Sequence, residues 1–311
     1  MKHDLLLIGP LHAPTLKYLE ENYNTYRYDQ AGDKDAFLAA MAPRITAIAT
    51  QGDYRVGEDI LGGLPRAKLL ASFGAGYDGI DTEAAARRGV AVTNTPDILS
   101  DCVADTVFAL ILAVVRRVVI YDRYVREGRW ESGPAPLTGK VWGEKLGILG
   151  LGRIGLEIAE RAKGFRMDIA YHNRRPRPDV PYTYYASPVE LARNVAILVV
   201  MTPGGDDTRE IVNRGVIDAL GPNGYLINAS RGSTVDEAYL IEALRDKRLA
   251  GAGLDAYLDS PRVPKELIAL DNAVLLPHVG SATKHTRDAM GRVLIENIAA
   301  FFANKPLPTP I

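Results

Sequence analysis

Short apolar runs alternate with amphipathic segments along almost the whole chain, and this alternation restricts the fold more than any other feature of the sequence. Segments with helical periodicity include Ala13–Glu21, Thr82–Arg88, Arg153–Lys163 and Glu237–Asp246. Ten runs are predicted to be strands: Asp4–Ile8, Ile45–Ala49, Lys68–Ser72, Val90–Thr93, Lys145–Leu149, Met167–Tyr171, Ala196–Met201, Gly224–Asn228, Gly251–Leu254 and Val274–Pro277. Strands that alternate with helices form parallel βαβ units, so the sequence predicts an α/β protein with helices on both faces of its sheets.

The length of the chain and a break in this pattern indicate two α/β domains. A chain of 311 residues exceeds one typical domain. The alternation stops near residues 94–105, where one long apolar helix is predicted over Val103–Tyr121. An irregular stretch with Gly, Pro and both Trp residues follows and is typical of an arm rather than of a core element.

Composition and charge exclude several partners and environments. The formal net charge is −1, with no basic stripe or acidic tail, which argues against nucleic acid and anionic membranes as partners. The longest apolar stretch, Val107–Val115, is too short to span a bilayer. A single cysteine, Cys102, cannot form an internal disulfide and fits a reducing compartment. We therefore expect a cytoplasmic protein, and no metal site, because no His, Asp and Glu residues show ligand spacing.

The motif Gly150-Leu-Gly152-Arg-Ile-Gly155 follows a predicted strand and opens a predicted helix. Gly150 permits the tight turn, Gly152 lets the backbone approach a pyrophosphate, and Gly155 allows close packing of helix and strand. The first helical turn, with Arg153 and Ile154, offers N–H groups and a positive dipole to phosphates. Glycines at this spacing also occur in ordinary turns, but in this context they predict a dinucleotide site.

The end of the next strand indicates which dinucleotide to expect. NAD sites usually place Asp or Glu about 20 residues after the glycines, where it bonds the ribose 2′-OH. Here the residues are Asn173, Arg174 and Arg175, and no carboxylate precedes Asp179. Asn and Arg can bind a 2′-phosphate that an acid would repel, so we predict NADP(H), with NADH as the alternative. If the cofactor is NADH, Arg174 and Arg175 are ordinary solvated charges.

Six stretches resemble the D-isomer-specific 2-hydroxyacid dehydrogenases, particularly their bacterial glyoxylate/hydroxypyruvate reductase branch. They are SFGAGYDGID (72–81), GVAVTNTPDILSDCVAD (89–105), LGILGLGRIG (146–155), INASRGSTVDEAYLIEAL (227–244), GAGLD (251–255) and LLPHVGSAT (275–283). The resemblance implies a flavodoxin-like substrate domain (1–99 plus 285–311) and a Rossmann NADP-binding domain (100–284), with the active site in the cleft between them. It also implies reduction of a small 2-oxo acid by NADPH and a homodimer formed through the 100–145 region.

Two residues are predicted to perform the chemistry that the resemblance implies. Reduction of a 2-oxo acid requires an anchor for the carboxylate, a group that polarises the carbonyl, and a proton donor. Arg231 follows an apolar strand in a Ser-Arg-Gly turn, and its planar guanidinium suits the first two tasks. His278 also follows a strand, and histidine suits the third. A surface salt bridge for Arg231 and a structural role for His278 are the alternatives.

Further contacts with substrate and cofactor are expected, some from the residues themselves and some from the same resemblance. The turn Gly74-Ala75-Gly76 can offer backbone N–H groups to the substrate carboxylate, although it also fits an ordinary glycine turn. Asp255 matches the family residue that bonds the nicotinamide carboxamide. Other expected cofactor contacts are Thr106, Thr202, Pro203, His278 and Gly280. Side chains around Gln51–Tyr54 are expected to select the substrate.

One position departs from the family pattern. Members usually carry Glu five residues after the Asp255 position, where it hydrogen-bonds the catalytic His. Here Ser260 takes that place, and the nearest carboxylate, Asp259, is one residue early. Losing one hydrogen-bonded charge partner costs about 1–3 kcal/mol, so we expect a slow enzyme, with Asp259 as a candidate substitute. The alternative is a nucleotide-binding sensor or scaffold with weakened catalysis.

Overall fold

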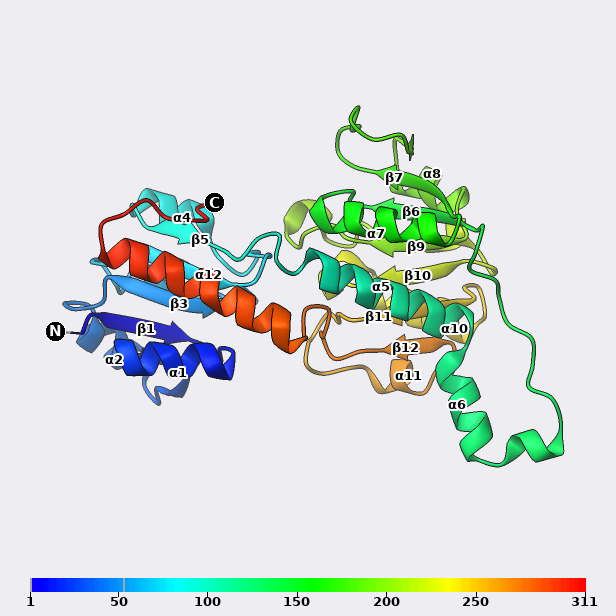
Figure 1. The fold of residues 1–311 in the computed structure, drawn as a ribbon, viewed down its shortest axis with the longest axis horizontal. Coiled ribbons are helices and arrows are strands. Elements are labelled where there is room, and N and C mark those ends of the chain that lie inside the picture. The colour runs from blue at the N-terminus through cyan, green and yellow to red at the C-terminus, as the bar shows by residue number, and fades with distance from the viewer. Residues whose placement is uncertain (1, 53) are drawn as a thin grey trace. The chain divides into compact units, whose positions relative to one another are not determined.

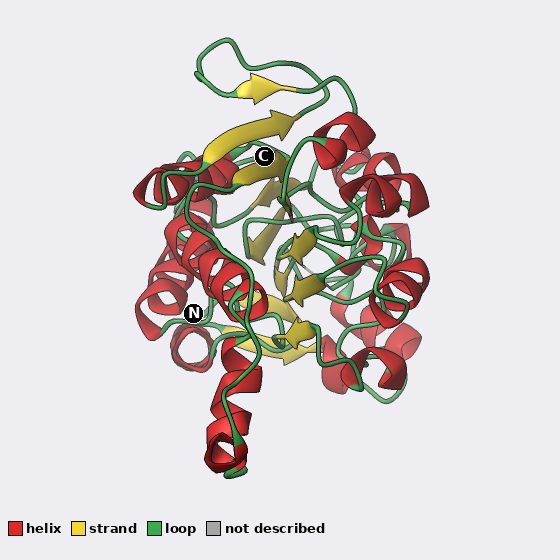
Figure 2. Ribbon diagram, turned by 90° about the vertical axis from the view of Figure 1, so that its right-hand side faces the viewer, coloured by secondary structure: helices red, strands yellow, loops and turns green. Residues whose placement is uncertain are grey.

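The computed structural model describes residues 2–52 and 54–311, and the chain divides into two compact units (Figure 1). One unit comprises residues 1–99 and 281–311, and the other comprises residues 100–280. Each contains one parallel sheet, and helices cover the strands on both faces (Figure 2). The predicted α/β class with two doubly wound parallel sheets is therefore confirmed. Asp53, within the stretch expected to select the substrate, lies outside the described residues.

The sheet of the first unit has the order β2-β1-β3-β4-β5. Its strands are β1 (Asp4–Ile8), β2 (Asn24–Arg27), β3 (Ala47–Gln51), β4 (Leu69–Phe73) and β5 (Ala91–Thr93). Helices α2 (Lys34–Met41), α3 (Glu58–Leu61) and α4 (Thr82–Arg87) pack on one face, and α1 (Ala13–Asn22) and α12 (Lys284–Phe302) on the other. The strand order 2-1-3-4-5 is that of flavodoxin-like folds.

The sheet of the second unit has the order β12-β11-β10-β9-β6-β7-β8. Its strands are β6 (Lys145–Leu149), β7 (Asp168–His172), β8 (Thr183–Tyr184), β9 (Ile197–Val200), β10 (Tyr225–Asn228), β11 (Gly251–Leu254) and β12 (Ala273–Leu275). The direction of strand succession reverses between β6 and β9, as in Rossmann folds. Ligands bind such sheets outside the carboxyl ends of the strands, at this reversal.

Helices cover both faces of this sheet, which explains why its central strand β9 is apolar at every position. In β9, Ile197 and Val199 pack with α5 (Ser100–Val115) and α7 (Arg153–Gly164). The alternate residues Leu198 and Val200 pack on the opposite face. The helices of that face are α8 (Pro188–Arg193), α9 (Arg214–Leu220) and α10 (Glu237–Arg245). Successive side chains of a strand point to opposite faces, so all four are buried.

The prediction of one continuous helix over Val103–Tyr121 is wrong. Helix α5 ends at Val115, Arg117 adopts a left-handed conformation with φ of +50°, and α6 spans Val118–Arg126. Helix α5 packs its apolar face against β10, β11 and α7, whereas no described residue of α6 is buried. The chain therefore leaves the core at Arg117, and α6 stands away from the sheet of its unit (Figure 1).

The sequence also failed to indicate strands β2 and β8. Both lie at an edge of their sheet, and no residue of either strand is fully buried. Short edge strands of this kind need no continuous apolar run, so the signal used for the other strands is absent. The bounds of the ten predicted strands differ from the observed ones by two residues at most. Within the described residues, no helix is long and apolar enough to cross a membrane.

Candidate nucleotide and substrate site

Most predicted site residues lie at one edge of the sheet of the second unit. Because its strands are parallel, the loops that follow their carboxyl ends meet at that edge. These residues follow β6 (Gly150, Gly152, Arg153, Ile154, Gly155), β7 (Asn173, Arg174, Arg175), β9 (Thr202, Pro203), β10 (Arg231), β11 (Asp255, Asp259, Ser260) and β12 (His278, Gly280). Thr106 reaches the same edge from α5, since its Oγ1 lies 3.3 Å from the carbonyl oxygen of Gly280.

The three glycines after β6 meet different steric demands. Gly150 has a φ of +101°, and a Cβ there would lie 2.8 Å from the backbone of Met201 and Thr202. A Cβ at Gly155 would lie 2.7 Å from the carbonyl oxygen of Gly150. At Gly152, a Cβ would meet no described atom within 4 Å, so packing within the protein does not require glycine there. The space at Gly152, at the start of α7, fits a pyrophosphate bound by backbone N–H groups.

Thr202 provides a second, independent sign of a ligand at this edge. Its side chain is buried, and its Oγ1 has no hydrogen-bond partner among the described residues. A buried hydroxyl without a partner is costly and rare. Thr202 follows β9, directly across the strand reversal from Gly150. The space at Gly152 and the Thr202 hydroxyl together fit a bound dinucleotide.

The side chain of Asn173, which we expected to bind NADP, contacts the glycine-rich turn. Its Oδ1 accepts a hydrogen bond from Leu151 N at 2.6 Å, and its Nδ2 donates to Leu151 O at 3.3 Å. Arg177 donates from Nη1 to the same carbonyl oxygen at 3.1 Å. Hydrogen bonding to Asp179 raises the pKa of Arg177, which secures its positive charge beside the turn.

Sequence reasoning missed Arg177 and named its exposed neighbours. Arg174 is 90% exposed and lies 3.6 Å from the carboxylate of Asp207, and Arg175 is also exposed. The spacing after β7 indicates only that several cations lie there. Which cation turns toward the glycine-rich turn depends on the path of the loop, so the sequence carried no signal that would have singled out Arg177.

Arg231 lies in a turn that the buried Asn228 holds at the carboxyl end of β10. The Asn228 Oδ1 accepts hydrogen bonds from Ser230 N at 3.0 Å and Ser230 Oγ at 2.9 Å. Its Nδ2 donates to Arg231 O at 2.9 Å. Gly232 lets the turn approach the next loop, because a Cβ there would lie 2.0 Å from the carbonyl carbon of Tyr257. The backbone of Arg231 is therefore fixed, which limits the positions that its guanidinium can reach.

His278 follows β12 in a left-handed backbone conformation, with a φ of +56°. Residues with a Cβ rarely adopt this conformation. The carboxylate of Asp255 accepts hydrogen bonds from the next two backbone amides, Val279 N and Gly280 N, each at 2.8 Å. Thr106 Oγ1 bonds Gly280 O on the other side. The turn that carries His278 is thus held from β11 and from α5.

The side chains of Ser260 and Asp259 make local contacts in the loop after β11. Ser260 Oγ donates to Tyr257 O at 3.0 Å and accepts from Tyr257 N at 3.3 Å. The exposed Asp259 carboxylate accepts from Arg262 Nε at 2.9 Å. Ser260 and His278 line one cavity of about 330 Å³. Its other lining residues are Tyr257, Pro261, Val263, Ile268, Leu275, Leu276 and Pro277, so no carboxylate of the described residues lines it.

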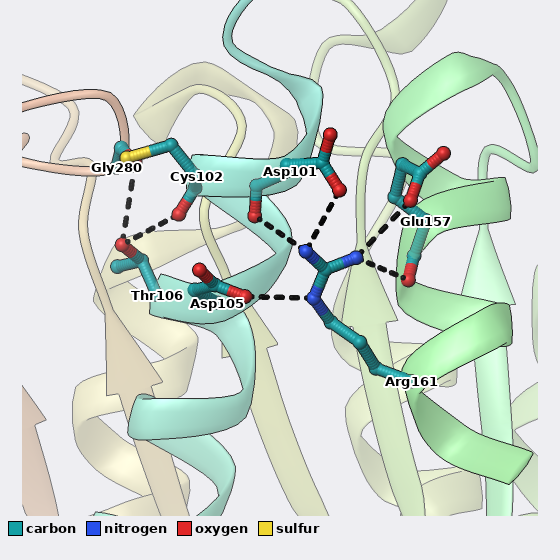
Figure 3. A network of polar contacts seen from close by, with 7 residues as sticks. All are labelled: Asp101, Cys102, Asp105, Thr106, Glu157, Arg161 and Gly280. Atoms are coloured by element: carbon teal, nitrogen blue, oxygen red, sulfur yellow. Dashed lines mark hydrogen bonds and ion pairs between the residues drawn. The ribbon is translucent and has the colours of Figure 1, made fainter. Parts of the chain in front are cut away.

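A polar network joins the nucleotide helix α7 to α5 (Figure 3). Arg161 on α7 bonds Asp105 at 2.7 Å and Asp101 at 2.9 Å, both on α5, and Glu157 at 3.1 Å. Burial lowers the pKa of Arg161, but hydrogen bonds to these carboxylates raise it overall. Thr106, one residue after Asp105, bonds Gly280 O. Helix α5 therefore connects the helix of the glycine-rich turn with the turn that carries His278.

The predicted anion-binding turn Gly74-Ala75-Gly76 belongs to the first unit and follows β4. The N–H of Gly74 donates to Thr95 Oγ1 at 3.0 Å, so it is already used within the protein. No hydrogen bond joins the N–H of Ala75 or Gly76 to another described residue. Two of the three amides can therefore bind an anion. Among the described residues, no group of three or more His, Cys, Asp or Glu could hold a metal ion.

Known proteins resemble this chain over its whole length. The family model described as D-isomer specific 2-hydroxyacid dehydrogenase, NAD binding domain, matches residues 108–280. A hydroxyphenylpyruvate reductase of Plectranthus scutellarioides is 46% identical over 308 residues, which are 99% of this chain and 98% of the relative. A glyoxylate/hydroxypyruvate reductase of Arabidopsis thaliana is 44% identical over 307 residues, 99% of this chain and 98% of the relative.

Solved structures agree with these similarities. A 2-hydroxyacid dehydrogenase from Ketogulonicigenium vulgare Y25 has a TM-score of 0.93 at 41% identity, covering 100% of this chain and 99% of that chain. An NADPH-dependent glyoxylate/hydroxypyruvate reductase from Sinorhizobium meliloti, in complex with NADP and malonate, has a TM-score of 0.92 at 39% identity. The match covers 100% of this chain and 97% of the Sinorhizobium chain.

Proposed function

Because the chain belongs to the D-isomer specific 2-hydroxyacid dehydrogenase family, we propose that it reduces a small 2-oxo acid to the D-2-hydroxy acid with NADPH. The observation that carries this proposal is the convergence of the glycine-rich turn, Arg231 and His278 at one edge of one sheet. Two relatives are named as reductases of hydroxyphenylpyruvate and of glyoxylate or hydroxypyruvate. We propose a substrate of the glyoxylate or hydroxypyruvate kind.

Each group in the site has a separate task in this reaction. The dinucleotide supplies a hydride to the carbonyl carbon of the substrate. Arg231 binds the substrate carboxylate and polarises the carbonyl, since a guanidinium presents several donors in one plane. His278, as imidazolium, gives its proton to the carbonyl oxygen and then regains one from water.

The preference for NADPH rests on the cationic end of β7. Arg177 is held beside the glycine-rich turn by its bond to Leu151 O. A guanidinium there can bind a 2′-phosphate, and Asn173, Arg174 and Arg175 lie on the same loop. Arg177→Ala should therefore weaken NADPH binding more than NADH binding, as measured by titration of the protein with each cofactor. Equal affinities of the wild type for the two cofactors would contradict the preference.

The partner proposed for the 100–145 region is a second copy of the chain. Helix α6 and the segment after it expose large apolar side chains, namely Val118, Val119, Val125, Trp130, Leu137 and Trp142. Leu137 is 97% exposed. Exposed apolar residues concentrated in one segment are typical of an interaction surface. Leu137→Asp should shift the protein from dimer to monomer in light scattering, and a monomeric wild type would contradict the proposal.

The function is tested by assaying a panel of 2-oxo acids with NADPH and with NADH. Arg231→Ala should raise KM for the oxo acid and lower kcat, because the residue both binds and polarises. His278→Ala should lower kcat and leave NADPH affinity nearly intact. Arg245→Ala serves as a matched control, since Arg245 ends α10 and pairs with its neighbour Asp246. Wild-type turnover in either site variant removes that residue from the mechanism.

One observation favours a second candidate, a nucleotide-binding sensor or scaffold with weakened catalysis. Ser260 and Asp259 both make contacts within their own loop, so the position of the family Glu does not hold a carboxylate. Tight NADPH binding without turnover across the whole panel would support this candidate over the enzyme.

A further inference from the structure

We propose that Asp255 is a positioning residue for His278, and that it acts by holding the backbone of residues 278–280. This role differs from bonding the nicotinamide carboxamide, which the family resemblance implies for Asp255. It rests on the proposed function, because a positioned His278 matters for catalysis only if His278 donates the proton.

Both oxygens of the Asp255 carboxylate are directed at this turn. Oδ1 lies 2.8 Å from Val279 N, and Oδ2 lies 2.8 Å from Gly280 N. Asp255 is 2% exposed, so both hydrogen bonds lie away from water. Hydrogen bonds to an ionised acceptor are roughly twice as strong as neutral ones. A single buried carboxylate therefore binds the two amides that directly follow His278.

The conformation of His278 explains why such a clamp is needed. Its φ of +56° is unfavourable for a residue with a Cβ. Conformations of this kind persist only where the surroundings impose them. Gly280 allows the close approach, because a Cβ there would lie 3.1 Å from Asp255 Oδ2 and 3.3 Å from Val103 Cγ2. The two bonds to Asp255 thus restrain the backbone of the turn from which the imidazole extends.

Thr106 completes the clamp from α5. Its Oγ1 lies 3.3 Å from Gly280 O and 3.2 Å from Cys102 O, and these two backbone carbonyls share its single proton. Thr106 carries no charge, so a change at Thr106 alters the position of the turn without altering the electrostatic field at His278. This separates positioning from any direct effect of the Asp255 charge.

A carboxylate oxygen can accept more than one hydrogen bond, so the clamp and a carboxamide contact can coexist. The experiment must separate them. Asp255→Asn keeps the size of the side chain but turns an NH2 group toward one of the two amides. We expect kcat to fall about 10- to 100-fold, the factor that corresponds to one charge-assisted hydrogen bond. The same factor is expected with the 3-acetylpyridine analogue of NADP⁺, which lacks the carboxamide NH2, in the oxidation of the 2-hydroxy acid.

A readout without cofactor comes from amide hydrogen exchange. In the cofactor-free protein, Val279 and Gly280 should exchange slowly, and Asp255→Asn should speed both about tenfold or more. Thr106→Val, which keeps the shape and loses the hydroxyl, should lower kcat, and Thr106→Ser should restore it. Asp271→Asn is the control for loss of a carboxylate, since Asp271 is exposed and pairs with Arg123.

Two results would overturn the proposal. One is unchanged exchange at Val279 and Gly280 in Asp255→Asn. The other is a loss of rate in Asp255→Asn that disappears with the 3-acetylpyridine analogue, because the residue then acts through the carboxamide. If Asp255→Asn does not fold, wild-type turnover in Thr106→Val also counts against the clamp. A wild-type protein that reduces no 2-oxo acid refutes the proposed function instead, while the exchange experiment still tests the clamp.

Discussion

Replacing Ser260 by Glu tests whether a carboxylate at this position controls the proton donor. Ser260 and His278 line the same cavity. The Ser260 hydroxyl bonds only the backbone of Tyr257 among the described residues. The longer side chain of Glu would place a carboxylate at the cavity that His278 also lines. A carboxylate next to histidine stabilises the imidazolium, which is the form that donates the proton.

The size of the effect follows from the surroundings of His278. His278 is exposed, so an effective dielectric constant of about 20 applies, and two charges about 4 Å apart then attract by about 4 kcal/mol before desolvation. After desolvation, a hydrogen bond to a charged group contributes about 1.5–3 kcal/mol. At about 1.4 kcal/mol per pH unit, the alkaline decline of the reductase rate should move upward by about 1–2 pH units.

The assay is kcat/KM for 2-oxo acid reduction as a function of pH, with saturating NADPH. Ser260→Ala is the control, because it removes the two bonds to Tyr257 without adding a charge and should leave the pH profile of the wild type. In Ser260→Glu, reduction at alkaline pH should become about tenfold faster or more. A folded Ser260→Glu variant with an unchanged pH profile would refute the reasoning.

Three further predictions follow from charged contacts. Asp259→Asn should change the reductase rate by less than about fivefold, because Asp259 pairs with exposed Arg262; a collapse of the rate at neutral pH would show that Asp259 serves His278. Arg161→Ala should lower the free energy of unfolding in urea by about 1–2 kcal/mol, since three carboxylates lose their shared partner. An unchanged urea concentration at the midpoint of unfolding would contradict this prediction. Hydrogen bonds from Lys284 and His12 lower the pKa of Asp288 to about 2. A carboxyl whose pKa is lower in the folded than in the unfolded state stabilises the folded protein at pH values above the unfolded pKa. The wild type should therefore exceed Asp288→Asn in free energy of unfolding by a full margin above about pH 5, and this margin should disappear toward pH 2. A difference in free energy of unfolding that does not change with pH would count against the prediction.

Hydrophobic periodicity was sufficient to predict the buried strands, but it did not predict the edge strands or the end of α5. Strands covered by helices on both faces, such as β6 and β9, are apolar at nearly every position, and so they could be predicted. The edge strands β2 and β8 are only partly buried, so nothing in their composition sets them apart. The prediction of one helix over Val103–Tyr121 was wrong because the apolar pattern continues in the sequence beyond Val115, where α5 ends.

The site shows the same division. The sequence by itself determined that Gly150, Arg231 and His278 each follow a strand, and parallel strands bring such residues to one edge. This inference needs only local periodicity and the direction of the strands. Tertiary structure alone decided that Arg177 turns toward the glycine-rich turn and that Asp255 binds the amides of the His278 turn. These contacts join loops from different strands, and their geometry depends on backbone paths that residue types and spacings do not specify.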